Sequence, residues 1–349
     1  MATTALDATS LTLVDLQKRM APDGSLLPLV EQLQQRNPFL QSMVWKEGNL
    51  DTGHRVSARS ALPSIAWVRF NEGISQSKST TDSYEEHCGM LEGLSSIDTR
   101  IADLNGKAAE IRASEDDGFL AQMANSLEGA FFYETTASNP ERILGLSARL
   151  GSTTSKYGNQ ILKADANAAG ANQSSIWLIG WGERTVYGIT PRGKASGLVM
   201  EDMGKQRVLD SNSKPLWKYE TRFQWHCGLC VEDYRYAVRI ANVDMNRITG
   251  VAGSAWTSAA FNSDLVQLMI QAFYQVYDPA VVRIAWYCDR KVAAFLHMQA
   301  RAQGSNSTLS IDPAPMTGSP GLFGRPLVRC MGAPIYVTDA LSNAEAVVA

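Results

Sequence analysis

Residues 323–341 read FGRPLVRCMGAPIYVTDAL. A Gly-x-Pro step leads into a run rich in apolar residues, which ends in Thr-Asp-Ala-Leu at residues 338–341. Apolar and β-branched residues bounded by Gly and Pro predict a strand. We therefore predict that the fold closes on a strand, followed by a short tail at residues 342–349.

The composition is that of a globular protein that can bury a core. Of the 349 residues, 45% are hydrophobic and 19% are charged, and the formal net charge is −3. This charge provides no global basic field to hold nucleic acid. No apolar run approaches the roughly 20 residues of a membrane-spanning helix, and the N-terminal residues lack the pattern of a secretory signal. No membrane partner is predicted.

A long helix is predicted from one face that carries large apolar residues at every fourth position: Phe119, Met123, Leu127 and Phe131. Ser114 and Asp117 form a start that resembles a capping box. The helix could also begin earlier, near Lys107, and would then span about 25 residues. Asn139-Pro140 predicts its end.

Residues 43–97 have the residue pattern of strands. His54 to Ser60 alternates, Leu62-Pro63-Ser64 can turn the chain, and Ile65 to Phe70 is interpreted as the returning strand. The following residues, 71–83, are polar. An isolated ribbon of two strands is only marginally stable in water. We therefore predict that this hairpin lies on a neighbouring subunit.

Further elements are predicted from the same signals: helices over Leu11–Met20 (capped by Ser10) and Leu26–Arg36, a buried strand over Ser175–Gly182, one or two long strands over Gln224–Ala241, helices capped by Asn262 and Asp289, and a loop over Gly304–Gly321.

The order of helical arm, long hairpin, long helix, mixed α/β segment and closing strand resembles the Hong Kong 97 fold of tailed-phage major capsid proteins. Within that group the chain is most similar to the Epsilon15-type major capsid proteins. Besides residues 323–341, the blocks that carry the resemblance are Met43–Leu50, Thr52–Arg55, Ser77–Thr81, Cys88–Glu92, Ala102–Gly106, Ile179–Trp181, Tyr236–Asn242 and Asn343–Ala346.

The resemblance implies an α+β chain divided into an N-terminal arm (1–42), an extended hairpin loop with flanking peripheral strands (43–90), a peripheral domain with a long spine helix (91–140), an axial domain (141–341) and a C-terminal tail (342–349). Many proteins of this fold continue after the closing strand into further peripheral strands, and here that part is short. Whether residues 200–260 return to the peripheral sheet is therefore left open.

The resemblance further implies a structural protein and not an enzyme. It would self-assemble as pentamers and hexamers into the icosahedral head that encloses the double-stranded DNA of a tailed bacteriophage. Assembly would take place in the host cytoplasm and the product would be the virion capsid. The implied partners are other copies of the chain, scaffolding and portal proteins, decoration or cement proteins, and packaged DNA held without sequence preference. The alternative is a non-viral shell of the same fold that encloses cargo.

We expect the extended loop to make the contact between subunits, through His54, Arg55, Arg59, Trp67, Arg69 and Phe70. The three arginines could instead bind nucleic acid, but arginines on a ribbon more often form a solvated or inter-subunit face. Some relatives of the fold join a hairpin lysine covalently to an asparagine of a neighbour. The predicted hairpin tip, Ser57 to Trp67, contains no lysine, and Lys46 and Lys78 are placed near its base. We therefore expect non-covalent stabilisation.

A second rival interpretation is a thiol oxidoreductase that uses Cys227 and Cys230. That chemistry needs the first cysteine at a helix N-terminus, whereas Val231 to Ile240 has the pattern of a strand. Residues three apart in a strand point to opposite faces. The chain has five cysteines, and this odd, scattered set favours free thiols over a disulfide framework.

Two clusters could suggest a metal site. His87-Cys88, His226-Cys227 and Cys230 would supply enough ligands for zinc, but adjacent residues are not spaced to wrap one ion, so strand residues are the simpler interpretation. Glu115-Asp116-Asp117 is interpreted as charge at a helix N-terminus. No metal, cofactor or catalytic motif is predicted.

Overall fold

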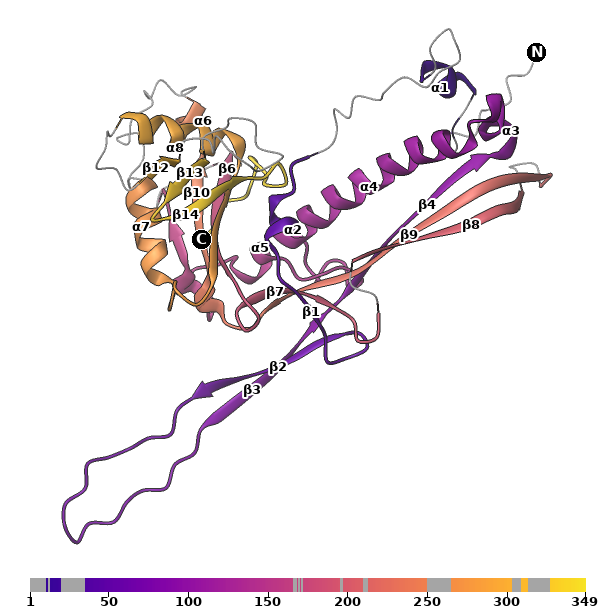
Figure 1. Cartoon of the computed structure of the whole chain (residues 1–349). Coiled ribbons are helices and arrows are strands. Elements are labelled where there is room, and N and C mark those ends of the chain that lie inside the picture. The colour runs from indigo at the N-terminus through magenta and orange to yellow at the C-terminus, as the bar shows by residue number, and fades with distance from the viewer. Residues whose placement is uncertain are drawn as a thin grey trace.

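The computed structural model describes residues 11, 13–19, 35–165, 168, 170, 172–194, 197–209, 213–249, 265–302, 309–312 and 327–349. Figure 1 shows a body of mixed helix and sheet, a limb formed by α4 lying along strands, and a hairpin that projects away from both. The α+β character predicted from the sequence is confirmed.

The helices and strands follow one another as α1 (Leu13–Lys18), α2 (Pro38–Ser42), β1 (Trp45–Glu47), β2 (Gly53–Ala61), β3 (Thr80–His87), β4 (Gly89–Asp98), α3 (Thr99–Ala102), η1 (Leu104–Gly106), α4 (Ala108–Tyr133), α5 (Leu146–Arg149), η2 (Gly158–Gln160), β5 (Ile161–Lys163), β6 (Gln173–Trp181), β7 (Val186–Thr190), β8 (Leu198–Leu209), β9 (Pro215–Val231), η3 (Tyr234–Tyr236), β10 (Ala237–Asp244), α6 (Met245–Thr249), α7 (Leu265–Gln275), β11 (Arg283–Cys288), α8 (Arg290–Ala302), β12 (Leu309–Asp312), β13 (Leu327–Cys330) and β14 (Ala333–Val337).

The body is built around β6, which is buried at every residue. β6 pairs antiparallel with β10 on one side and with β11 on the other, and β11 continues into β14 and β13. α7 contacts β10, while α8 contacts β12, β13 and β14. A strand covered on both faces needs apolar residues at consecutive positions. The Ile-Trp-Leu-Ile run at 176–179 meets this need, and the predicted buried strand is confirmed.

The limb consists of α4 lying against β4, with β9 and β8 beyond it (Figure 1). β4 pairs with β9 from Gly89 opposite Cys227 to Asp98 opposite Lys218. The ring of Phe119 on α4 stacks on that of Phe223 on β9, with the ring centroids 5.9 Å apart. This contact helps to fix how the helix lies on its sheet.

The limb and the body share one continuous strand, β9. Its first part pairs with β4 and β8, and its last residues, Gly228 to Val231, pair with β7 of the body. The strands of the limb and of the body therefore belong to one sheet.

The C-terminal half of α4 supplies an aromatic cluster to the body core. Phe131 and Phe132 are fully buried, and Phe39 of α2 lies against both, at centroid distances of 5.8 and 4.7 Å. Phe39 also contacts Trp181 and Tyr287 edge-on, at 5.0 and 5.2 Å. Offset and edge-on aromatic contacts of this kind add to the stabilisation that burial provides.

The last residues are tied into the body. The backbone N–H of Glu345 donates to the carbonyl oxygen of Gln173, and its carboxylate accepts from Arg239 Nη2 at 2.8 Å, with both charged side chains buried. The N–H of Val348 donates to Asn242 Oδ1 at 2.9 Å. The segment expected as a tail is therefore held to β6 and β10 by its own residues and by residues of those two strands.

Four details of the sequence interpretation are confirmed. Two strands, β9 and β10, occupy the region of Gln224 to Ala241, and α8 begins at the Asp289 cap, whose carboxylate accepts from the N–H of Lys291 at 2.8 Å. α1 and α7 lie within helices that were expected. The long helix begins at Ala108, as the earlier of its two predicted starts requires.

Two details of the long helix are wrong. Its start at Ser114 is wrong because the helix already begins at Ala108, and Ile111 of this earlier part is buried. Its end at Asn139-Pro140 is wrong because the helix stops at Tyr133.

Two details of the C-terminal region are also wrong. The single closing strand is a hairpin of β13 and β14, since Met331 and Gly332 turn the chain with φ of 51° and 79°. Within the predicted loop at 304–321, residues 309–312 form β12, which pairs with β13. The four residues Leu-Ser-Ile-Asp alternate too briefly to predict a strand by themselves, and only their pairing with β13 makes them one.

Some predictions lie outside the described residues. They are the Ser10 and Asn262 caps, most of the predicted helix at 26–36, most of the predicted loop at 304–321, and the Gly-x-Pro step at 324–326.

We predict that Phe131→Ala destabilises the dissociated subunit by about 3–5 kcal/mol, because it removes a fully buried ring from a close-packed core. The measurement is chemical denaturation of the subunit. The same change at Phe70, which is 102% exposed, is the matched control and should alter the free energy of unfolding by less than about 0.5 kcal/mol. Equal effects at the two positions would contradict the placement of this helix face.

Candidate functional site

The hairpin of β2 and β3 is the most exposed feature of the described chain (Figure 1). Its ladder runs from Gly53 opposite His87 to Ala61 opposite Thr80. The residues between the strands, 62–79, form what we call the distal loop. The chain reverses within it at residues 69–72, where the N–H of Glu72 donates to the carbonyl of Arg69 at 3.2 Å.

This arrangement corrects the predicted hairpin. The returning strand is not Ile65 to Phe70 but Thr80 to His87, much of which the sequence predicts as a polar connection. Strand pairing requires only backbone groups, so a polar segment can form the ladder. Lys78 consequently lies in the distal loop and not near the base, while Lys46 lies in β1, where its Nζ donates to the carbonyl of Glu183 at 3.4 Å.

The distal loop exposes large apolar side chains. Every residue from Arg59 to Ser83 is exposed. The exposed fractions are 104% for Trp67 and 102% for Phe70, and the other apolar side chains exposed on the loop are Leu62, Ile65, Val68 and Ile74. Six large apolar side chains exposed on one loop favour an interaction site.

The base of the hairpin is held by a buried ion pair. Arg149 donates to Glu86 through Nη1 at 2.5 Å and Nη2 at 2.6 Å, and both side chains are almost fully buried. Arg149 Nη2 also donates to the carbonyls of Leu144 and Leu229, each at 3.1 Å. These contacts join β3 to β9 and to the segment before α5, so the direction of the hairpin is fixed at its base.

Two of the residues predicted for the subunit contact are engaged within their own subunit. His54 is buried at the base: its Nδ1 accepts from the N–H of Asn49 at 3.2 Å, its ring meets Tyr187 edge-on, and burial lowers its pKa. It therefore supports the hairpin from within. Arg55 Nε donates to Glu85 Oε1 across the ladder at 2.7 Å.

The other four residues predicted for the contact are exposed and lie in the distal part of the hairpin: Arg59, Trp67, Arg69 and Phe70. Arg59 belongs to β2, and the other three lie in the distal loop.

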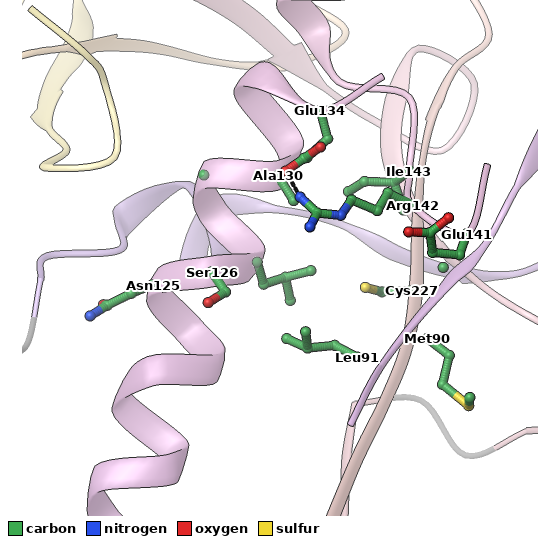
Figure 2. Close-up of a pocket in the computed structure, with 13 residues that line it drawn as sticks. Met90, Leu91, Asn125, Ser126, Ala130, Glu134, Glu141, Arg142, Ile143 and Cys227 are labelled. Carbon is green, nitrogen blue, oxygen red and sulfur yellow. Dashed lines mark hydrogen bonds and ion pairs between the residues drawn. The ribbon is translucent and has the colours of Figure 1, made fainter. Parts of the chain in front are cut away.

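A pocket of about 550 Å³ lies between the C-terminal half of α4 and strands β4 and β9 (Figure 2). We call it the α4 pocket. Its lining includes the apolar side chains of Met90, Leu91, Leu127, Ala130 and Ile143. Charged side chains of Glu134, Glu141 and Arg142 also line it, and Arg142 pairs with Glu134.

Sequence reasoning missed the α4 pocket. Its residues come from β4, α4, β9 and the segment after α4, and no motif joins these segments along the chain. The one local signal is the pair of small residues Gly129 and Ala130 in the helix, which leaves room beside it.

The cysteine pair does not form a redox site in this structure. Cys227 and Cys230 both lie on β9, not at a helix N-terminus, and they are buried in different clusters on opposite faces of the strand. Burial raises the pKa of the Cys227 thiol, and it raises the pKa of the Cys230 thiol to about 12. Thiols with raised pKa values are poor nucleophiles at neutral pH.

The metal alternatives find no support within the described residues, where no three His, Cys, Asp or Glu side chains are grouped to hold an ion. The interpretation of Glu115-Asp116-Asp117 as N-terminal helix charge is wrong, since α4 begins well before them, at Ala108. Glu115 pairs with Arg19 at 2.8 Å, and Asp116 is buried, which raises its pKa.

Membrane insertion through a helix also finds no support. In the described part of the chain, no helix is long and apolar enough to cross a membrane.

Comparison with solved structures identifies the class of protein. The chain matches the structure of bacteriophage Epsilon15 with a TM-score of 0.72 and 25% identity, over 99% of this chain and 99% of the other. It also matches the SrpI encapsulin of Synechococcus elongatus PCC 7942, with a TM-score of 0.43 and 12% identity over 67% of this chain and 97% of the other. The match to the capsid of the Myoviridae phage XM1 has a TM-score of 0.38 and 11% identity over 62% of this chain and 95% of the other. The Epsilon15 match over the whole chain shows the Hong Kong 97 type of capsid fold that the sequence resembles.

The family model for major capsid protein GP7 matches residues 21–349, so the chain belongs to the family of major capsid protein GP7. A search of curated proteins gave no match. The predicted resemblance to phage major capsid proteins, and the function as a bacteriophage major capsid protein that it implies, are therefore confirmed.

We predict that joining Ala61 to Thr80 through an Asn-Gly turn, in place of the distal loop, leaves a folded subunit that cannot form stable shells. Residues 62–79 bury little in their own subunit, and Asn-Gly suits a tight hairpin turn. Circular dichroism and thermal melting report the fold, and sedimentation reports the shells. Loss of cooperative unfolding would place the loop in the subunit's own core.

Proposed function

We propose that copies of this chain assemble as pentamers and hexamers into the icosahedral head that encloses the double-stranded DNA of a tailed bacteriophage. Membership of a major capsid protein family supports this proposal. The observation that carries the mechanism is the distal loop, whose six large apolar side chains are exposed in the isolated subunit. Their transfer from water onto a neighbour would stabilise the shell by roughly 25 cal/mol per Å² of apolar surface buried.

In this proposal the subunits are held by many repeated contacts. Each subunit would offer its loop to one neighbour and receive a loop from another. Linking several weak contacts raises the overall affinity well above that of one contact. We assign the contact to Arg59, Trp67, Arg69 and Phe70, because all four are exposed in the distal part of the hairpin. Arg55 is also exposed but already donates to Glu85 in its own subunit.

We also propose the division of the chain that the sequence suggested: an arm at 1–42, the extended loop with flanking strands at 43–90, a peripheral domain with α4 at 91–140, an axial domain at 141–341 and a tail at 342–349. The β2–β3 hairpin would be the extended loop. Pairing of β9 with both β4 and β8 supports assigning residues 198–227 to the peripheral sheet, although they follow the first axial strands in sequence.

The other partners follow from the same function. We propose scaffolding and portal proteins during assembly in the host cytoplasm, decoration or cement proteins on the finished head, and DNA held without sequence preference. The net charge of −3 suits a shell that confines DNA without adhering to it. We propose no catalytic activity: burial of both Cys227 and Cys230 and their raised thiol pKa values argue against the oxidoreductase alternative.

We predict that the purified protein forms closed shells or capsomers at high concentration, with its scaffold supplied if assembly requires one. Analytical ultracentrifugation and electron micrographs are the measurements. Particles from infected or expressing cells should contain double-stranded DNA when the packaging machinery is present, whereas protein cargo without DNA would favour the non-viral shell. A protein that stays monomeric under all of these conditions would sink the proposal.

We also predict that the shell matures without covalent cross-links. The turn at residues 69–72 contains no lysine. Lys78, the one lysine of the distal loop, has no ion pair among the described residues with a carboxylate that could take up its proton. Heads boiled in denaturant should give one band near 38.1 kDa on a gel. A ladder that survives both denaturant and reductant would refute this prediction, and a ladder that collapses in reductant would instead indicate disulfides between subunits.

A further inference from the structure

Glu128 places a carboxyl group in the interior of the subunit. It lies in the C-terminal half of α4, and its side chain is 0% exposed. A carboxylate can accept about four hydrogen bonds. Within the described part of the chain, Oε1 accepts from Thr338 Oγ1 at 2.5 Å, Oε2 has no hydrogen-bond partner, and no ion pair of Glu128 occurs. A buried carboxyl group with so few partners is costly in its charged form.

The carboxyl group of Glu128 lies where three segments of the chain meet. Thr338 follows β14, and the hydroxyl that it donates to Glu128 also accepts from the N–H of Ala340 at 3.1 Å. α2 lies beside the C-terminal half of α4 through the ring contacts of Phe39 (Figure 1). The N–H groups of Phe39 and Leu40 lie close enough to the carboxyl group to favour its charged form. We call this meeting of α2, α4 and residues 338–340 the α2 junction.

The charged groups around the α2 junction do not offset a negative charge on Glu128. Asp339 has the same sign and disfavours the charged form. Arg290 of α8 is already paired with Asp339 at 2.7 Å, and the N–H of Arg36 donates to Asp339 at 3.2 Å. α2 itself contains no titratable side chain. Further titratable groups on the packed elements have partners of their own: Tyr287 and Arg283 on β11, Asp289 after β11, and Tyr133 on α4.

We propose that the carboxyl group of Glu128 is a proton-controlled latch, which holds α2 and residues 338–340 against α4 when it is neutral and loosens this junction when it is ionised. The geometry carries the proposal: a carboxyl group without exposed surface, with one hydrogen bond and one oxygen atom that has no partner. An ionised carboxylate needs water or further donors. Since the group is closed to solvent, water can reach it only if the packed segments move apart. The latch belongs to the isolated subunit and does not rest on the proposed function.

α2 is the segment of the junction that can yield. It has five residues, and Asn37 at its N-cap makes no side-chain hydrogen bond. Helices this short are marginal without tertiary contacts. By contrast, α4 has 26 residues, and Thr338 is tied to β11 because its N–H donates to the carbonyl of Cys288 at 3.1 Å. Phe39 also contacts Trp181 of the body core, so the expected change is a local opening at α2 and not an unfolding of the body.

The direction of the pH dependence follows from the burial of Glu128. Burial raises the pKa of this carboxyl group from the ordinary 4.5 to about 7, while Thr338 and the N–H groups of Leu40 and Phe39 lower it by less. The folded subunit therefore binds this proton more tightly than the unfolded chain does. The stabilisation that the proton provides is complete below about pH 4.5 and is lost as the pH rises through about 7. The latch is thus closed in acid and open above neutral pH.

Chemical denaturation of the full-length, dissociated subunit tests the sign. Between about pH 5.5 and about pH 8, the unfolding equilibrium constant of the wild type should rise by about tenfold or more relative to that of Glu128→Gln, which has a similar size but does not titrate. The matched control is Asp117→Asn, which removes an exposed carboxylate from the same helix and should follow the wild type. Glu128→Leu is a second variant without a titrating group.

Hydrogen exchange locates the change within the subunit. After correction for the pH dependence of the intrinsic exchange rate, the amides of α2 in the wild type should lose about tenfold or more of their protection over the same pH interval. The amides of β6 should keep their protection. In Glu128→Gln, α2 should show no such loss.

Each outcome decides for or against the latch. The same pH dependence in the wild type and in a folded Glu128 variant would overturn it. Equal losses of protection in α2 and β6 would also overturn it, because the buried acid would then act on the whole subunit. If neither Glu128 variant folds, the exchange of the wild type decides: a loss confined to the α2 junction supports the latch, and unchanged protection of α2 refutes it. The capsid function is tested separately by assembly and stands or falls without the latch.

Discussion

The continuity of β9 is the constraint on which the rest of the structure depends. This 17-residue strand pairs with β4 and β8 beside α4 and then with β7 in the body. The crossing is tight at Gly228, where a Cβ atom would lie 2.8 Å from the carbonyl oxygen of His87 and 2.9 Å from a side-chain carbon of Ile189. A larger residue would have to displace the backbone there, whereas glycine allows the close approach. The limb, the body and the hairpin base therefore meet at one residue.

The subunit combines a firmly anchored hairpin base with a distal loop that its own chain leaves uncovered. At the base, Glu86 and Arg149 are buried and pair with each other. Removing one partner of such a pair leaves an uncompensated charge and costs about 3–5 kcal/mol. The distal loop instead keeps its apolar side chains in water. The subunit thus has a buried core of its own, while the apolar side chains of its distal loop stay exposed to water. Burial of these side chains between subunits would favour assembly, as expected for a member of a capsid protein family.

The long helix α4 connects the body of the subunit to the limb. Phe131 and Phe132 at its C-terminal end belong to the body core, while Phe119 lies on the limb sheet. Glu128, on the same helix, is fully buried and accepts from Thr338 Oγ1 at 2.5 Å, and burial raises its pKa to about 7. The helix is thus tied to the residue that follows β14. It fixes the position of the body relative to the limb that carries the α4 pocket.

The sequence by itself determined the local elements and the class of the fold. The four-residue spacing from Phe119 to Phe131 specifies a helix, and the apolar run at 176–179 specifies a buried strand, because both signals depend on near neighbours along the chain. Only the tertiary structure decided that the polar segment of β3 forms the returning strand, that His54 is buried, and that Glu141 shares a pocket with α4. These features depend on contacts between segments distant in the chain, and local periodicity carries no information about such contacts.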